Sequence, residues 1–164
     1  MSNPVYLFSV KTVKYGTPTG SNTMPQSLTA IGDTVKGSVT IDESEGTVTK
    51  FHVDQKQPPV RTVKTEEGEL TATMQFYDLT FANVAAIKGG HGSATGYTPA
   101  IGFTQVEKAL EIELDSGHKI NMFNAMCVTR ITGGGGRDKM FAMEMKATPQ
   151  MAADLSGSWE IKPV

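Results

Sequence analysis

Apolar and polar residues alternate along most of this chain, which predicts strands rather than helices. In residues 69–77, Leu70, Ala72, Met74 and Phe76 fall on one face and threonine, glutamine and glutamate on the other. Short turns separate such segments, so neighbouring strands are expected to pair antiparallel. The predicted strands are residues 34–42, 47–54, 60–65, 69–77, 109–114, 119–131, 140–147 and 158–162, with a first strand or extended arm within residues 5–15.

Two turns organise the first half of the predicted sheet. Residues 43–46 would form the acidic tip of a hairpin between the strands at 34–42 and 47–54. Residues 55–59 would form a second turn, because the two prolines that end it cannot donate to a strand ladder. We therefore expect residues 34–77 to contain four successive strands of one antiparallel sheet.

A single helix interrupts the strands at residues 78–90. Asp78 or Thr80 can cap its N-terminus, and Gly89 can supply the left-handed residue that ends it. One short amphipathic helix in a β chain is expected to cover an open face of the sheet. The predicted fold is therefore mainly β, an antiparallel β-sandwich or barrel with one flanking α-helix. The predicted apolar stripe of the helix consists of Phe81, Val84 and Ala85, flanked by Leu79 and Ile87.

The length of 164 residues fits one domain, residues 1–164, that can bury a core of its own. Residues 1–30 contain a Gly-, Pro- and Ser-rich stretch and are interpreted as an extended N-terminal arm. Residues 91–103 are rich in Gly and Thr and predict a long loop. Loops of this length are uncommon in a compact domain unless a partner orders them.

Charge and cysteine content narrow the possible functions. The formal net charge is −2 and Lys and Arg form no run, which argues against a basic nucleic-acid-binding face. No segment approaches the roughly 20 apolar residues of a membrane span, and the N-terminus has no secretory signal pattern. Cys127, the one cysteine, excludes an internal disulfide and is interpreted as a small buried side chain.

Residues suited to catalysis or metal binding do not come together in the sequence. His52, His91 and His118 lack the spacing of metal ligands. The glycine-rich segments at 90–96 and 133–139 match neither a dinucleotide fingerprint nor a phosphate loop ending in Gly-Lys-Ser/Thr. No Gly-x-Ser-x-Gly elbow is present. We therefore predict no catalytic residue, no cofactor and no metal, and a protein that is not an enzyme.

The order of these elements resembles the tail tube proteins (major tail proteins) of long-tailed bacteriophages, which are related to the tubes of contractile injection systems. The likeness covers roughly residues 30–150 and depends on pattern rather than on an invariant motif. It is carried by residues 34–41, 51–55 with Pro59, 69–76, 78–87 with the Gly89–Gly90 ending, 108–112 and 120–125.

The resemblance implies a structural protein of the virion tail, assembled in the cytoplasm of a bacterial host. Its subunits would form homohexameric rings that stack into a hollow tube, through which the genome passes on ejection. Tape measure, tail terminator and baseplate proteins would be further partners, and DNA a transient, non-specific cargo. Candidate lumen-facing residues are Ser38, Thr40, Lys50, His52, Thr71, Thr73 and Gln75. Candidate inter-subunit and inter-ring residues are Glu43, Glu45, Gln55, Pro59, Ser93, Thr95 and Tyr97.

Two alternatives stay open at this point. The same strand pattern fits a tube protein of a contractile injection or type VI secretion system, which would carry effectors instead of DNA. It also fits a stand-alone β-sandwich binding module, for example one for carbohydrate. Such a module usually presents clustered aromatic side chains, whereas the aromatic residues here are spread along the chain. The oligomeric state separates a tube subunit from a monomeric module.

Overall fold

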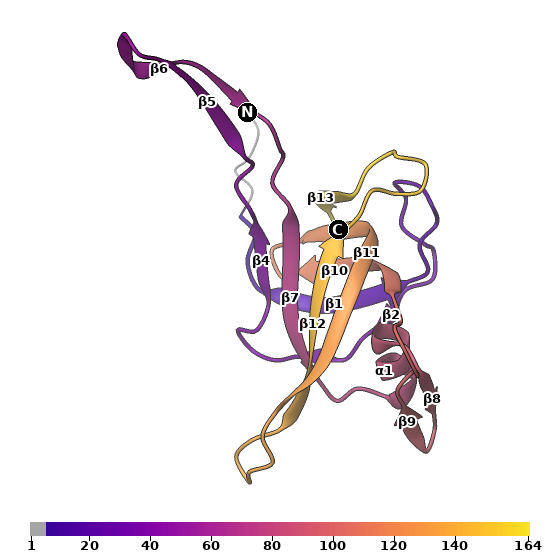
Figure 1. Cartoon of the computed structure of the whole chain (residues 1–164). Coiled ribbons are helices and arrows are strands. Elements are labelled where there is room, and N and C mark those ends of the chain that lie inside the picture. Colours follow the sequence, from indigo (N-terminus) through magenta and orange to yellow (C-terminus); the bar gives the residue numbers. More distant parts are fainter. Residues whose placement is uncertain (1–5) are drawn as a thin grey trace.

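The computed structural model describes residues 6–164 and confirms a mainly β protein with 52% strand and 5% helix. One nine-stranded antiparallel sheet forms the body, and two separate two-stranded ribbons project from it (Figure 1). The strands of the large sheet are β1 (Val10–Gly16), β2 (Thr29–Ala30), β3 (Asp33–Thr34), β4 (Thr40–Glu43), β7 (Leu70–Tyr77), β10 (Val106–Leu114), β11 (His118–Gly133), β12 (Phe141–Pro149) and β13 (Trp159–Pro163). The ribbons pair β5 (Val48–Val53) with β6 (Lys56–Lys64) and β8 (His91–Ser93) with β9 (Gly96–Thr98), and the helix is α1 (Phe81–Lys88).

The large sheet curls until its two ends approach each other. Its strand order is β2-β1-β10-β11-β12-β7-β3, with β13 on β11 and β4 on β7. Since β2 and β3 are only two residues apart in the chain, residues 29–34 link the two ends of the sheet. Asn83 of α1 holds this link, because its Nδ2 donates to the backbone oxygens of Ala30 at 3.1 Å and Ile31 at 2.8 Å. The body is therefore a strongly curled sheet rather than a flat one.

A bulge in β11 contributes to this curvature. Between Lys108 and Leu110 the partner residues on β11 jump from Ala125 to Met122, so β11 carries one extra residue there. Bulges bend a strand and increase its twist. One edge of β11 pairs with β13 over residues 118–122 and then with β12 over residues 125–133. In Figure 1, β1 accordingly crosses the direction of β7 and β12.

The core lies inside the curled sheet, as the alternation predicts. Leu70, Ala72, Met74 and Phe76 of β7 are all buried. They meet the inward residues of β10 and β11 across the body. Further buried members of this cluster are Val13, Ile31, Ile87, Val106, Leu110, Ile112, Leu114, Ile120, Met122, Ala125, Cys127, Met145 and Ala147.

The helix begins and ends at two of the predicted capping residues. The Thr80 hydroxyl accepts from the backbone N–H of Asn83, and the backbone N–H of Gly89 donates to the oxygen of Ala85. Gly89 has a φ of 82°, which favours glycine. The helix is shorter than the predicted 78–90, and Phe81, expected in its apolar stripe, is 44% exposed. Val84 and Ile87 form the buried face instead.

The predicted pairing of residues 34–54 is wrong. The segment 34–42 is not one strand: β3 and β4 are separated by a turn in which Gly37 has a φ of 74°. β4 pairs with β7, not with β5, and β5 pairs with β6 in a ribbon outside the large sheet. Alternation identifies strands but does not choose partners, and here the pairing of β4 with β7 brings Ile41 against the core.

The predicted turn at 55–59 is also displaced. The turn occupies Asp54 and Gln55, and both prolines lie within β6. Proline is tolerated there because β6 pairs on one side only and the ladder is irregular between Phe51 and Val53.

The two predicted long loops contain regular structure. Within residues 91–103, β8 and β9 form a short hairpin that packs against α1. Within residues 1–30, β1 pairs with both β2 and β10, and residues 17–28 form the loop between β1 and β2. The first five residues of the predicted arm lie outside the described residues.

Candidate assembly surfaces

The outer face of β4, β7 and β12 is polar and brings together five of the seven candidate lumen residues. Thr40 of β4 is the register partner of Thr73 of β7, and Thr71 and Gln75 share its face. Ser38 joins them because its hydroxyl accepts from the backbone N–H of Gln75 at 3.2 Å. Lys146 of β12 lies opposite Thr73 on the same face.

A charged cluster orders one part of this polar face. Nε of Arg130 on β11 donates to Oε1 of Glu144 at 2.6 Å, and Nε2 of Gln75 donates to Oε2 at 3.3 Å. These hydrogen bonds, that of Arg130 first, hold the pKa of Glu144 below its usual range. Glu144 in turn raises the pKa of Arg130. The face therefore presents small hydroxyl groups beside an internally compensated ion pair.

The remaining two lumen candidates, Lys50 and His52, lie elsewhere. Both are exposed on β5, in the ribbon formed by Val48–Val53 and Lys56–Lys64, which we call the arm ribbon. This ribbon extends away from the body (Figure 1). The structure therefore does not bring these two side chains together with Thr40, Thr71, Thr73 and Gln75.

The arm ribbon buries almost nothing. Every residue of β5 is exposed, and in β6 only Val63 is partly covered. Phe51 is 54% and Val60 57% exposed. A two-stranded ribbon alone in water is marginally stable at best, so these apolar side chains indicate a surface that a partner covers.

A narrow neck, residues 44–47 and 65–69, joins the arm ribbon to the body. Ser44 N–H donates to the oxygen of Glu69 at 3.0 Å, and Thr65 N–H donates to the oxygen of Thr47 at 2.8 Å. At Gly68 a Cβ would collide with the Ser44 carbonyl, so glycine permits the two chains to pass this closely. These bonds continue the β4–β7 pairing toward β5 and β6 and hold the ribbon in a defined direction.

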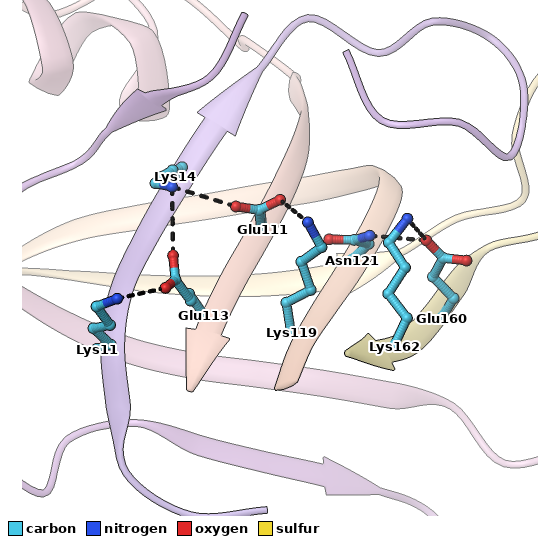
Figure 2. Close-up of polar contacts among 8 residues, drawn as sticks. All are labelled: Lys11, Lys14, Glu111, Glu113, Lys119, Asn121, Glu160 and Lys162. Carbon is cyan, nitrogen blue, oxygen red and sulfur yellow. Dashed lines mark hydrogen bonds and ion pairs between the residues drawn. The ribbon is translucent and has the colours of Figure 1, made fainter. Parts of the chain in front are cut away.

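On the opposite side of the core, the outer face of β1, β10, β11 and β13 carries a ladder of ion pairs (Figure 2). Nζ of Lys11 lies 2.7 Å from Glu113, and Lys14 lies 3.5 Å from both Glu113 and Glu111. Lys119 continues the ladder at 3.4 Å from Glu111. The hydrogen bond from Lys11 lowers the pKa of Glu113, and Glu113 raises the pKa of Lys11.

The ladder ends at β13. Nζ of Lys162 lies 2.9 Å from Oε1 of Glu160, and this hydrogen bond is the main cause that lowers the pKa of Glu160. Asn121 also donates to Oε1 of Glu160 at 2.8 Å (Figure 2). Cations and carboxylates thus alternate across four strands. This face carries many charged side chains, but its net charge is close to zero.

The candidate inter-subunit residues are distributed over three places. Glu43 ends β4 and Glu45 lies in the neck. Gln55 lies in the turn of the arm ribbon and Pro59 in β6. Ser93, Thr95 and Tyr97 belong to the β8–β9 hairpin, where the Tyr97 hydroxyl donates to the Gly89 oxygen at 2.8 Å and so supports the end of α1.

Two further apolar regions were not predicted from the sequence. Ile101 and Phe103, in the loop after β9, are almost completely exposed beside a surface cavity of about 280 Å³. A cavity of about 420 Å³ lies where Leu7, Ile41 and Trp159 meet, at the open end of the curled sheet. An uncharged segment running from residue 92 to residue 106 was the available signal for the first region.

Side chains that could bind a metal or react chemically are not brought together in the described structure. Among residues 6–164, no group of three or more His, Cys, Asp or Glu side chains is placed to hold a metal ion. Burial raises the pKa of the Cys127 thiol to about 12, which keeps it protonated at neutral pH. Over the same residues, no helix has both the length and the apolar character needed to cross a bilayer.

Comparisons with known proteins identify no family for this chain. No model of a known protein family matches the chain. No curated protein sequence matches it either.

Proposed function

We propose that this protein is the structural subunit of a bacteriophage tail tube. Its copies would associate into hexameric rings, and the rings would stack into a hollow tube through which the genome leaves the virion. Tape measure, tail terminator and baseplate proteins are the expected partners at the ends of such a tube. The proposal combines the resemblance of the sequence pattern with the surfaces described above.

The arm ribbon is the observation that carries this proposal. It is a long element with exposed apolar side chains, and the neck holds it clear of its own body. It contributes nothing to the core, so its own subunit gains no stability from it. An element of this kind is consistent with a protein that becomes complete only on association.

Unfinished strand edges support the same proposal. In the described chain β4 pairs only with β7, and β13 only with β11, so each leaves one edge without a strand partner. Exposed edges are a hazard that neighbouring copies in a symmetric assembly can remove. The small hydroxyl side chains on the outer face of β4 and β7 are suited to a wet lumen that does not retain the passing DNA.

The test replaces residues 48–64 with a two-residue Asn-Gly turn. Because the ribbon buries so little, we expect the thermal midpoint of the subunit to change by no more than a few degrees. Size-exclusion chromatography with light scattering should show rings or longer assemblies for the full chain and monomers for the variant. Negative-stain microscopy should show tubes only for the full chain.

The matched control replaces Arg137 and Asp138, in the exposed turn between β11 and β12, with Asn-Gly, a site outside every candidate assembly residue; it should assemble as the full chain does. A full-length chain that stays monomeric at high concentration contradicts the proposal and favours a stand-alone module. Assembly that survives loss of the ribbon would show that the ribbon is not the element that carries association.

A further inference from the structure

The arm ribbon is strongly basic although the whole chain is slightly acidic. Within residues 48–64 four cationic side chains, Lys50, Lys56, Arg61 and Lys64, accompany one carboxylate, Asp54, which gives a formal net charge of +3. The whole chain carries −2, so the remainder carries −5. The sequence shows dispersed lysines and arginines, and the fold gathers these four on one projecting element.

The opposite charge gathers at the base of the same element. We call this base the acidic collar; it consists of Asp42, Glu43, Glu45, Glu66, Glu67 and Glu69, all exposed. Within the described structure the collar has one cationic partner, since Lys64 pairs with Glu67. The neck hydrogen bonds hold the two collar segments side by side, which concentrates like charges. A basic partner would relieve that repulsion.

Beyond Lys64 at its base, the ribbon points away from its own collar (Figure 1). β5 rises about 3.3 Å per residue, so the tip stands roughly 20 Å from the base. The neck also fixes its direction. The surface that complements the ribbon must therefore come from another molecule. A second copy of this chain offers such a surface, because every copy carries the acidic collar.

Exposed Phe51 and Val60 indicate a protein surface rather than nucleic acid as the partner. Nucleic acid would pair with the cations but would leave these apolar side chains in water, and the acidic collar would repel it. We propose that the arm ribbon of one subunit docks, by charge complementarity, on the acidic collar of the neighbouring subunit. This inference rests on the proposed function and specifies which surface receives the ribbon.

The docking is expected to be heterologous, because ribbon and collar are different surfaces of the same chain. Repeating such a contact generates a ring where the rotation closes and an open stack where it does not. Each subunit then gives one ribbon and receives one. The charge of each surface is neutralised only in the assembly, so the contact should weaken as salt concentration rises.

A charge-swap experiment tests the docking directly. The ribbon-reversed variant carries Lys50→Glu and Arg61→Glu, which takes the formal charge of the ribbon from +3 to −1. The collar-reversed variant carries Asp42→Lys, Glu43→Lys, Glu45→Lys and Glu69→Lys, which takes the formal charge of the collar from −6 to +2. None of these six exposed side chains forms a hydrogen bond or an ion pair within the described part of the subunit, so both variants should fold. The control, Lys36→Glu with Lys139→Glu, changes the net charge by the same −4 as the ribbon-reversed variant, at exposed sites outside both surfaces.

Each reversed variant alone should associate at least about tenfold more weakly than the wild type, since like charges then meet at the contact. An equimolar mixture of the two should recover assembly, with the variants alternating. The control should assemble as the wild type does. Light scattering at several salt concentrations provides the measurement.

Three results would overturn the docking, and one would overturn the ring itself. A mixture that stays unassembled, or a ribbon-reversed variant that assembles normally, means that the ribbon does not dock on the collar even if wild-type rings form. Normal assembly with weaker binding of a labelled 30-base-pair duplex by the ribbon-reversed variant assigns the ribbon to nucleic acid. Recovery of assembly as dimers only would keep the docking but contradict the proposed rings.

Discussion

Asn83 provides the sharpest test of how the curled sheet is held together. Its side chain makes three hydrogen bonds: it accepts from the Tyr15 hydroxyl at 3.0 Å and donates to the backbone oxygens of Ala30 and Ile31. These bonds fix residues 29–34, the segment that links the two ends of the large sheet. Asn83→Ala removes all three and leaves the carbonyl of Ile31 without this donor.

The size of the effect follows from those contacts. A protein hydrogen bond contributes about 1 kcal/mol net, and the bond to Ala30 counts for less because it is exposed. Asn83→Ala should therefore lower the free energy of unfolding by about 2–3 kcal/mol. With a urea m-value of about 2 kcal/mol/M, the midpoint falls by roughly 1–1.5 M at constant m.

Urea titration followed by tryptophan fluorescence measures this shift, since Trp159 packs against the core. Asn83→Asp is the informative companion, because it retains the acceptor for Tyr15 but turns a carboxylate toward two carbonyl oxygens. It should destabilise at least as much as the alanine variant. Tyr15→Phe, which removes one bond, should cost about 1 kcal/mol. An alanine variant within about 0.5 kcal/mol of wild type, or an aspartate variant milder than alanine, would refute this account of the closure.

Three shorter predictions address other features. Gly89→Ala should destabilise the protein by about 2 kcal/mol in thermal unfolding, because φ is 82° and the new Cβ would lie 2.8 Å from Cγ2 of Thr104. Arg130→Ala should raise the pKa of Glu144 toward its ordinary value, as followed by NMR titration. Because the pKa of Glu144 is lowered in the folded state, the stability that this pair provides is present at neutral pH. That stability is lost as pH falls through the acid range below about 4. Cys127 should stay unmodified by a thiol reagent at pH 8 in the folded protein and react fully in denaturant, since its pKa is about 12; rapid modification of the native protein would contradict its burial.

The local sequence predicted the features that depend only on neighbouring residues: strands, their buried faces and the helix caps. The alternation in β7 gave both the strand and its buried face, because a half-buried strand imposes a period of two on its residues. The caps at Thr80 and Gly89 were predicted from residue type and spacing alone. The mainly β, antiparallel fold with one helix followed from these signals.

Pairing partners and surfaces were not predictable in this way. β4 pairs with β7 across nearly thirty residues, and the intervening ribbon alternates just as a sheet strand would, although it has no core to face. The ion-pair partners of Glu111 and Glu113 come from β1 and β11, which no local pattern connects to these two residues. The extra residue in β11 likewise depends on the register with β10.

The two consecutive prolines of β6 have a consequence for how the arm ribbon meets other chains. Successive residues of a strand direct their amide hydrogens to opposite margins, so Pro58 and Pro59 together remove one donor from each margin whatever the register. An incoming strand could not add along β6 without losing a bond at that point. The prolines thereby disfavour open-ended fibre growth along that margin. The arm ribbon, despite its exposed apolar side chains, then associates through side-chain contacts rather than by adding strands.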